Sequence, residues 1–547
     1  MKTFLLKATL MLAAFAFGAT MLNAQDFTYG DLEYSINYDD VTVTVTGHVD
    51  GYDETGTLDI PTVAYYNGNP YTVTIIDSYA FYHCDGLNGT LVIPNTIMEI
   101  GDDAFDYCGF TGTVNIPASV EDIGYTPFYC CDGIEGFVVD PNNEYYDSRD
   151  NCNAIIRTYS NKLEIGCKNS TIPNTVVSIE EDAFNRVSGL TSIIIPSSVT
   201  TIGGWSFWFT GLTSINIPST VIAIGTNPFA GCAYLTSITV ESGNAVYDSR
   251  NNCNAIIRTN ANELISGCQN SVIPDDVTRI GDDAFYYIST LVGELLIPEQ
   301  ITSIGNYAYE GCSGLTGSLV IPNTVLEVGE SAFAYCTGFD GTLTLSEALT
   351  SIESWTFEEC RGFTGSLVIP NLVTSIGSSA FEDCRGFDGT LTLSKNLASV
   401  GSFAFASCSG FKDAEILAET PPSLESYPFG GFGSVTLMVP CGCVSAYENS
   451  PWSEQFTNII EDCTDVAETE SSWGRVYPNP TSGHVTIEAD NIRHLSIYNI
   501  IGEKVFESAV SGDTFEYDFR GWKAGLYVIR MEDGRGNQSS LTLLMNP

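Results

Sequence analysis

Residues 319–336 read LVIPNTVLEVGESAFAYC, and residues 367–384 read LVIPNLVTSIGSSAFEDC. Both stretches carry Ile-Pro, then Val or Ile before Gly, then Ala-Phe, and Cys three residues after the Phe. Aromatic residues recur at that Phe position with intervals of 22 to 24 residues, apart from two intervals of 56. The thirteen are Phe81, Phe105, Phe128, Phe184, Phe207, Phe229, Phe285, Tyr309, Phe333, Phe357, Phe381, Phe405 and Phe429. This period predicts a solenoid, whose coils bury their apolar sides against one another.

A single repeat predicts the course of one coil. Leu319 and Ile321 alternate with an outward residue, as in a short strand, and Pro322 ends that strand because it has no N–H to donate. Gly329 permits a tight corner, and Phe333 enters the core. We therefore expect a mainly β fold, a right-handed solenoid of stacked coils.

Nine of the seventeen cysteines lie three residues after the repeated aromatic. Stacked coils would place these side chains in one buried ladder, which we favour over a metal site or disulfides. Two pairs recur at the same separation, Cys152 with Cys167 and Cys253 with Cys268. The sequence leaves undecided whether each pair forms a disulfide. Beyond the repeats, Cys463 is expected to pair with Cys441 or Cys443. The nine are Cys84, Cys108, Cys131, Cys232, Cys312, Cys336, Cys360, Cys384 and Cys408.

The two long intervals contain near copies of one segment, residues 146–173 and 247–274, offset by 101 residues. Each predicts an added hairpin, in the first copy from a strand at 154–158 and a second at 163–166. Four equivalent arginines are expected to pair with nearby carboxylates: Arg149, Arg157, Arg250 and Arg258.

The remaining segments complete the domain plan. Residues 1–24 have a basic start, an apolar run and a small residue before the predicted cut, as in a signal peptide. Alternating Val and Thr near residue 42 favour a β-rich N-terminal cap over 25–72, followed by repeats over 73–440. A closing segment at 441–463 and a polar linker at 464–473 precede a C-terminal domain at 474–547. Short alternating strands there predict a small antiparallel β-sandwich.

Charge restricts the partners. The chain has 67 acidic and 21 basic residues, a formal net charge of −46. Such a surface repels phosphates, so we expect no nucleic-acid partner and no binding to anionic lipid. After the first segment the sequence contains no apolar run of the ~18 residues that a membrane helix needs, so no membrane span is predicted.

The repeat phrase resembles the BspA-like leucine-rich repeats over roughly residues 60–440. The C-terminal block resembles the type A sorting domain of the type IX secretion system. The matching positions are Tyr477, Pro478, Asn479, Pro480, Gly483, Gly502, Gly525 and Tyr527. These resemblances imply export through the periplasm by the type IX machinery and release or display at the outer cell surface. The repeat family includes adhesins that bind host proteins or other bacteria.

The sequence predicts no enzyme. The four histidines are dispersed, at His48, His83, His484 and His494, and we find no nucleophile elbow, P-loop or dinucleotide fingerprint. No cofactor and no metal are expected. Acidic pairs such as Glu358-Glu359 are interpreted mainly as solvated coil corners, with stacked Ca²⁺ sites as the alternative.

An aromatic cluster provides the candidate binding residues. Trp205, Trp208 and Phe209 surround the core Phe207 in a coil that lacks the repeated Cys. The structural interpretation is that these aromatic side chains fill the core in place of that Cys. The functional interpretation is an exposed patch that binds protein or glycan.

We therefore predict a secreted or surface-displayed repeat scaffold that binds an extracellular macromolecule. Protein adhesion is the first hypothesis and capture of a glycan or nutrient is the second. A hydrolase is the third, and it would require a pocket with convergent carboxylates.

Overall fold

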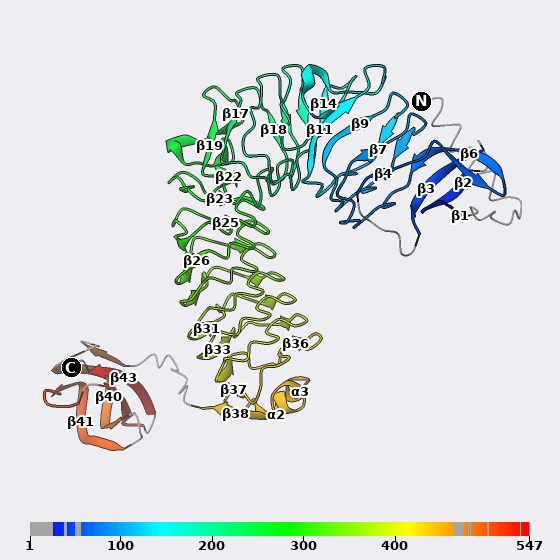
Figure 1. Ribbon diagram of the computed structural model, residues 1–547. Helices are drawn as coiled ribbons and strands as arrows, with labels where there is room; N and C mark the ends of the chain where they lie inside the picture. Colours follow the sequence, from blue (N-terminus) through cyan, green and yellow to red (C-terminus); the bar gives the residue numbers. More distant parts are fainter. Residues whose placement is uncertain are drawn as a thin grey trace, which may run out of the picture. The chain divides into compact units, whose positions relative to one another are not determined.

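The computed structural model describes residues 26–37, 41–49, 56–463, 474–477, 479, 481, 483–499, 503–523, 525–535 and 538–545. The chain divides into two compact units (Figure 1). The first runs to Val439 and includes Cys443–Ile460; the second consists of Pro440–Gly442 and the residues from Glu461 onward. The expected signal peptide and linker lie outside the described residues.

The first unit begins with an antiparallel arrangement that becomes parallel as the coils start. Strands β1 to β3 pair antiparallel, whereas β3 pairs parallel with β6, and β6 pairs parallel with the first coil strand, β8. Val43, Val45 and Val73 are fully buried in this sheet. The strands are β1 (Asp26–Tyr29), β2 (Leu32–Asn37), β3 (Thr42–His48), β5 (Val63–Tyr66), β6 (Asn69–Ile76), β8 (Glu99–Ile100) and β10 (Asp122–Ile123).

Each later coil adds a two-residue strand that ends directly before the position of the repeated Gly. Neighbouring coils pair in parallel register, as in Ile352 opposite Ile376. Gly377 follows the strand where the backbones nearly touch; a Cβ there would lie 2.4 Å from the Ser354 nitrogen. These strands are β15 (Ser178–Ile179), β16 (Thr201–Ile202), β18 (Ala223–Ile224), β23 (Arg279–Ile280), β25 (Ser303–Ile304), β28 (Glu327–Val328), β30 (Ser351–Ile352), β32 (Ser375–Ile376), β34 (Ser399–Val400) and β36 (Ser423–Leu424).

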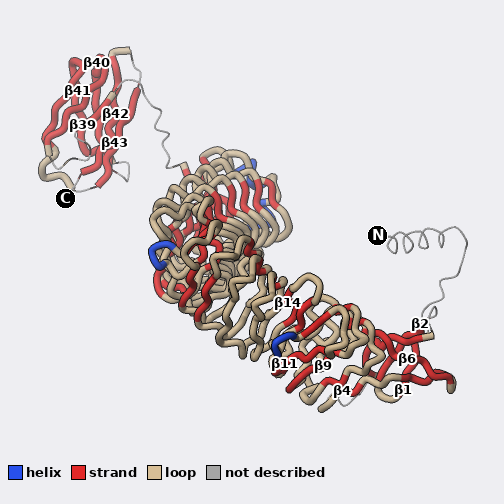
Figure 2. The backbone as a smooth tube through the Cα atoms, turned by 90° about the horizontal axis from the view of Figure 1, so that it is seen from above, coloured by secondary structure: helices blue, strands red, loops and turns tan. Residues whose placement is uncertain are grey.

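A second set of parallel strands comes from the segment before Ile-Pro. Its inward residues, such as Leu319 and Leu343, are buried. Loops connect the two sets, so most of each coil is irregular (Figure 2). The set consists of β4 (Leu58–Asp59), β7 (Leu91–Val92), β9 (Gly112–Ile116), β11 (Ile134–Val139), β17 (Ser214–Ile217), β19 (Ser237–Val240), β24 (Gly293–Glu294), β26 (Leu315–Thr316), β27 (Leu319–Val320), β29 (Leu343–Thr344), β31 (Leu367–Val368), β33 (Thr390–Leu393), β35 (Asp413–Ile416) and β37 (Thr436–Pro440). After the last coil, β38 (Asn458–Asp462) lies beside β37 in the same sheet.

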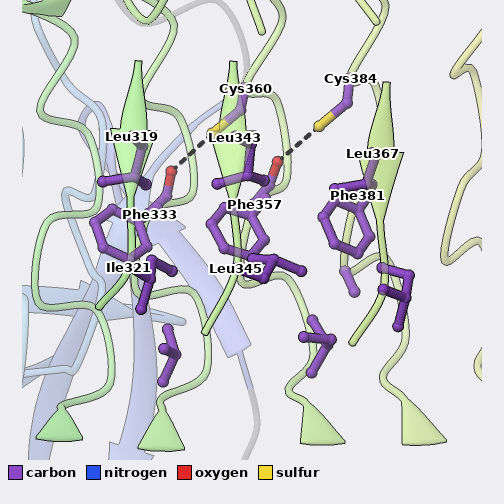
Figure 3. Packing of buried hydrophobic residues seen from close by; sticks show 14 of the residues in the cluster. Leu319, Ile321, Phe333, Leu343, Leu345, Phe357, Cys360, Leu367, Phe381 and Cys384 are labelled. Atoms are coloured by element: carbon purple, nitrogen blue, oxygen red, sulfur yellow. Dashed lines mark hydrogen bonds between the residues drawn. The ribbon is translucent and has the colours of Figure 1, made fainter. Parts of the chain in front are cut away.

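The repeated aromatics form the centre of the core. Phe333, Phe357 and Phe381 stack almost parallel, with ring centroids 5.6 and 5.2 Å apart (Figure 3). Offset stacking at this separation adds to the stabilisation from burial alone. The aromatic period therefore becomes a continuous ring stack within each run of ordinary coils.

The repeat cysteines form the predicted buried ladder. Each thiol from the second coil of a run donates to the carbonyl of the core aromatic one coil earlier, as from Cys384 Sγ to Phe357 O at 3.0 Å (Figure 3). Burial raises the pKa of Cys384 well above its usual range. Cys152, Cys167, Cys253 and Cys268 are also free thiols, so neither open pair is a disulfide.

The two long intervals contain the predicted hairpins. In each, three antiparallel strands join the parallel coil sheet at their last member. Arg149 pairs with Asp147 at 2.5 Å, and Arg157 pairs with Glu164, as the sequence predicts. The elements are β12 (Tyr146–Asp147), η1 (Arg149–Asn151), β13 (Ile155–Arg157), β14 (Lys162–Ile165), β20 (Tyr247–Asp248), η2 (Arg250–Asn252), β21 (Ile256–Arg258) and β22 (Glu263–Ser266).

Two short helices close the last coil: α2 (Val444–Glu448) and α3 (Trp452–Gln455). Trp452 is fully buried against Phe429, with ring centroids 5.4 Å apart, and its Nε1 donates to Pro422 O at 2.9 Å. The predicted disulfide forms between Cys441 and Cys463.

The second unit is one antiparallel, nearly closed sheet around its own core. Two of its strands, β40 and β41, are long, and each spans two of the short strands that the sequence predicts. The break in register near Ile492 lets the long β40 bend, so one sheet supplies both walls of the expected sandwich. The strands are β39 (Arg475–Tyr477), β40 (His484–Asn499), β41 (Lys504–Asp518), β42 (Gly525–Asp533) and β43 (Gln538–Met545).

Candidate binding face

Nearly every coil bends around its core aromatic through two residues with positive φ. Around Phe357 these are Trp355, at φ 56°, and Glu359, at φ 60°. The N–H of Trp355 donates to Ser378 O at 2.9 Å, and that of Glu359 donates to Glu382 O at 2.8 Å. Residues other than Gly rarely adopt this conformation, so the bonds to the next coil hold it in place. We call this edge of the solenoid the corner.

Exposed aromatic side chains recur at the first of the two corner positions. The rings of Phe403 and Tyr427, on neighbouring coils, stack with centroids 6.2 Å apart. Exposed rings that recur at one structural position are candidates for a binding surface, and contact between neighbouring rings makes the apolar patch contiguous there. We call the following five the aromatic corner row: Tyr79, Trp205, Trp355, Phe403 and Tyr427.

The structure brings the three predicted aromatics together at this edge. Trp205 and Trp208 have ring centroids 5.9 Å apart, and Trp208 and Phe209 are 5.2 Å apart. Trp205 is 38% exposed, and the other two are half-buried. Thr210 occupies the place of the missing Cys, where it donates to Phe207 O at 3.0 Å. The three aromatics therefore do not fill the cysteine position.

Arg186 completes this cluster, and the sequence reasoning missed it. Its guanidinium carbon lies 4.9 Å from the ring centroids of both Trp208 and Phe209. Its Nε donates to the Tyr129 hydroxyl at 2.7 Å, which joins two coils separated by a long interval. Burial raises the pKa of Tyr129 to about 12. Arg186 occupies the second corner position, as Phe209 does one coil later. Because equivalent positions stack, this shared place in the repeat could have indicated from the sequence that the two side chains meet.

Carboxylates at the corner are less solvated than expected. Asp283 is 7% exposed and Glu310 is 8% exposed. Burial, with help from Asp282, raises the pKa of Asp283 to about 7. Burial and the neighbouring Asp283 and Glu358 raise the pKa of Glu310 to about 7. The corner therefore holds carboxyl groups that ionise near neutral pH.

The stacked acidic pairs contact arginines. Arg361 binds Glu359 and also Asp383, the latter at 3.0 Å, and Arg385 binds Asp383 at 2.5 Å. Asp383 is buried, so the interpretation as a solvated corner is wrong for this residue. In the described part of the chain, Cys441, Glu461 and Cys463 place three potential metal ligands within 4.8 Å, but both sulfur atoms belong to the disulfide.

A cavity of about 400 Å³ opens beside the Arg186 cluster, between the coils of Phe128 and Phe184. Tyr129 contributes to its wall, together with the carboxylates of Glu180, Glu181 and Asp182. The sequence reasoning did not anticipate this cavity, because it lies where a hairpin interrupts the regular stack.

In the second unit, the sorting motif includes a contact with the last strand. Asn479 donates from Nδ2 to Thr542 O at 2.7 Å and accepts from Leu544 N at 2.8 Å. Tyr477 bonds to Glu488, and Tyr527 donates from its hydroxyl to Lys523 O at 2.9 Å. Two further motif positions are glycines in this unit, Gly483 and Gly525. The motif residues Pro478, Pro480 and Gly502 lie outside the described residues.

These coils and strands define a repeat solenoid followed by a secretion domain. The model of the BspA type leucine rich repeat region matches residues 68–165, 154–255, 255–388 and 363–450 in six copies. The chain belongs to that family. The model of the secretion system C-terminal sorting domain matches residues 475–544, which indicates type IX export to the outer surface or the medium. Among the described helices, none has the length and apolar character to cross a membrane.

Solved structures with likeness to this chain include two bacterial repeat proteins. A leucine rich cell surface protein from Faecalibacterium prausnitzii A2-165 is 23% identical, covers 73% of this chain and 96% of its own, and has a TM-score of 0.43. A leucine-rich repeat protein from Bacteroides ovatus ATCC 8483 is 20% identical, covers 80% and 100%, and has a TM-score of 0.34.

One curated relative matches a short segment. An endo-acting ulvan lyase from Formosa agariphila is 36% identical over 74 residues, which make up 13% of this chain and 14% of the lyase. The match thus spans about one seventh of that relative's length.

Proposed function

We propose that this exported scaffold binds an extracellular macromolecule along the aromatic corner row, and that the partner is a protein on a host or neighbouring cell. The observation that supports the proposal is the recurrence of exposed rings at one structural position, from Tyr79 to Tyr427. Large aromatic residues supply most of the affinity at protein interfaces because they bury much area with few rotatable bonds. The excess of acidic residues favours a partner with a basic surface.

The experiment measures saturable binding of the full chain to extracellular matrix proteins. We expect the combined variant Trp205→Ala, Trp355→Ala, Phe403→Ala and Tyr427→Ala to bind at least about tenfold more weakly. The matched control is Tyr159→Ala with Tyr234→Ala, because both tyrosines are exposed but lie outside the row. Equal loss in the row variant and the control would contradict the proposed face.

Capture of a glycan or nutrient is the second candidate, and the same row favours it. Sugar rings stack on exposed aromatic faces, and a row that follows the coils suits a chain of sugars. A glycan array probed with the same variants separates the two candidates. Glycan binding that requires the row, without protein binding, would establish the second candidate over the first.

A hydrolase has the least support. The cavity beside Asp182 does contain several carboxylates, which such chemistry requires. However, Glu164 pairs with Arg157, and Glu180 pairs with Lys162 at 2.9 Å. Any glycan that the array identifies should therefore remain intact on incubation with the protein, and release of shorter products would revive the hydrolase hypothesis.

A further inference from the structure

The cavity lies at a seam where the regular bonding between coils is interrupted. At ordinary corners, backbone N–H groups donate to the next coil, as from Trp205 to Thr226 O at 3.0 Å. Within residues 56–463, no backbone bond joins the corner at 125–130 to the one at 182–187. Side chains bridge it instead: the Tyr125 hydroxyl bonds to Asp182, and Arg186 bonds to Tyr129. The seam thus keeps a cavity of about 400 Å³.

The chain contains a closed counterpart of this seam. Between the coils of the second long interval, Asn227 Nδ2 donates to Asp283 O at 2.6 Å, and its Oδ1 accepts from Ser266 Oγ at 2.6 Å. The N–H of Gly231 also donates to Tyr286 O at 2.8 Å. These bonds connect the two corners directly, so the duplicated geometry does not by itself require an opening.

Among the positions that differ between the two seams, three correspond to residues that form the closing bonds of the second seam. With the offset of 101 residues between the copies, Thr126 stands in place of Asn227 and Ile165 in place of Ser266. Cys130 stands in place of Gly231. Thr126 and Ile165 both line the cavity and cannot form the amide–hydroxyl bridge of the other seam.

The open seam has a buried acceptor that lacks a hydrogen-bond partner. Asn185 is 8% exposed, its Nδ2 donates to Asp182 Oδ1 at 2.5 Å, and its buried Oδ1 has no hydrogen-bond partner. A buried acceptor without a donor costs free energy, and an N–H or O–H group that enters the cavity would offset that cost. In the described part of the chain, neither Glu181 nor Asp182 forms an ion pair, whereas Glu164 and Glu180 both do.

We propose that the seam cavity binds a guanidinium or ammonium group, which donates to Asn185 Oδ1 and lies beside the carboxylates of Asp182 and Glu181. Donors of this kind match the carboxylates of Glu181 and Asp182 in the wall, and Arg157, which also lines the cavity, is paired with Glu164. The volume is near the lower end of ligand pockets, which suits a group the size of one basic side chain. The group belongs to a free amine or to a basic residue of a polypeptide. This site is independent of the proposed aromatic corner row.

Calorimetry on the full chain tests the site with agmatine as the free cation and with butylurea, which carries no charged group, as the neutral control. A second arm uses a blocked tripeptide with a central arginine and the same peptide with citrulline. We expect saturable binding of at least one cation and none of the neutral analogues. Tighter binding of the tripeptide identifies a polypeptide as the source, and tighter binding of agmatine identifies a free amine. Absence of saturable binding at millimolar concentration, or equal binding of a neutral analogue, would overturn the proposal.

Two variants assign the binding to the seam. Asp182→Asn is expected to weaken binding about tenfold, because it removes the charge while an amide oxygen still accepts from Tyr125. Asp283→Asn alters the equivalent carboxylate of the closed seam and should leave the affinity unchanged. The double variant Thr126→Asn with Ile165→Ser rebuilds the closed seam and should abolish binding without lowering the melting midpoint. Wild-type affinity in both Asp182→Asn and the rebuilt seam would refute the assignment.

Discussion

At the scale of single residues, the repeated cysteine acts as a small buried donor. Its thiol contacts the carbonyl of the core aromatic one coil earlier, so each Cys joins two coils. Thr210 shows that a hydroxyl fits the same space, although it donates within its own coil. Packing and a weak hydrogen bond thus account for the position without redox or metal chemistry.

Cys384→Ala should lower the free energy of unfolding of the repeat array by about 1–2 kcal/mol. The change removes the bond to Phe357 O and leaves a small void in a fully buried site. Chemical denaturation followed by tyrosine and tryptophan fluorescence measures the effect. Lys395→Ala, at an exposed site, is the control, and an equal effect of the two changes would refute the ladder's contribution.

At the scale of elements, the corner combines tight turns with partly buried charge. The backbone bonds between coils hold side chains at fixed positions, and carboxylates on neighbouring coils are thereby forced close together. Asp283 and Glu310 illustrate the cost, because each has its pKa raised to about 7.

The repeat array should lose stability as the pH rises from about 5 to about 8. Both carboxyls bind protons more tightly in the folded state than in the unfolded state, so their contribution is present below the unfolded pKa and is lost through about pH 7. The loss should be of the order of 1–3 kcal/mol. Thermal unfolding across this range measures it. Asp283→Asn with Glu310→Gln should flatten the dependence, whereas Asp275→Asn, at an exposed site, should not.

At the scale of the whole molecule, an open solenoid needs a cover for its last coil. Trp452 and Phe456 supply it: their rings lie 5.4 and 4.9 Å from Phe429, the final member of the ring stack. Because each coil contacts mainly its neighbours, loss of the cover should act locally.

Trp452→Ala should destabilise the end of the array by about 3–5 kcal/mol, since it removes a fully buried indole. Hydrogen exchange is the measurement, with faster exchange expected in β35 and β37 and unchanged exchange in the first coils. Trp355→Ala removes an exposed indole and serves as the matched control. Uniformly faster exchange along the array would argue against local fraying.

The sequence by itself determined the solenoid, its aromatic and cysteine ladders, the added hairpins and the exported class. These follow because stacking places equivalent residues on one another, so a linear period becomes a spatial row. Only the tertiary structure decided that Arg186 joins Trp208 and Phe209, that Asp383 is buried, and that one long interval opens a cavity while its copy closes. The cavity depends on contacts between residues about 56 positions apart, such as Arg186 with Tyr129, where the repeat period no longer specifies which side chains meet. The contacts of Arg186 with Trp208 and of Asp383 with Arg361 lie within the regular stack, but they depend on side chains at positions that vary from coil to coil.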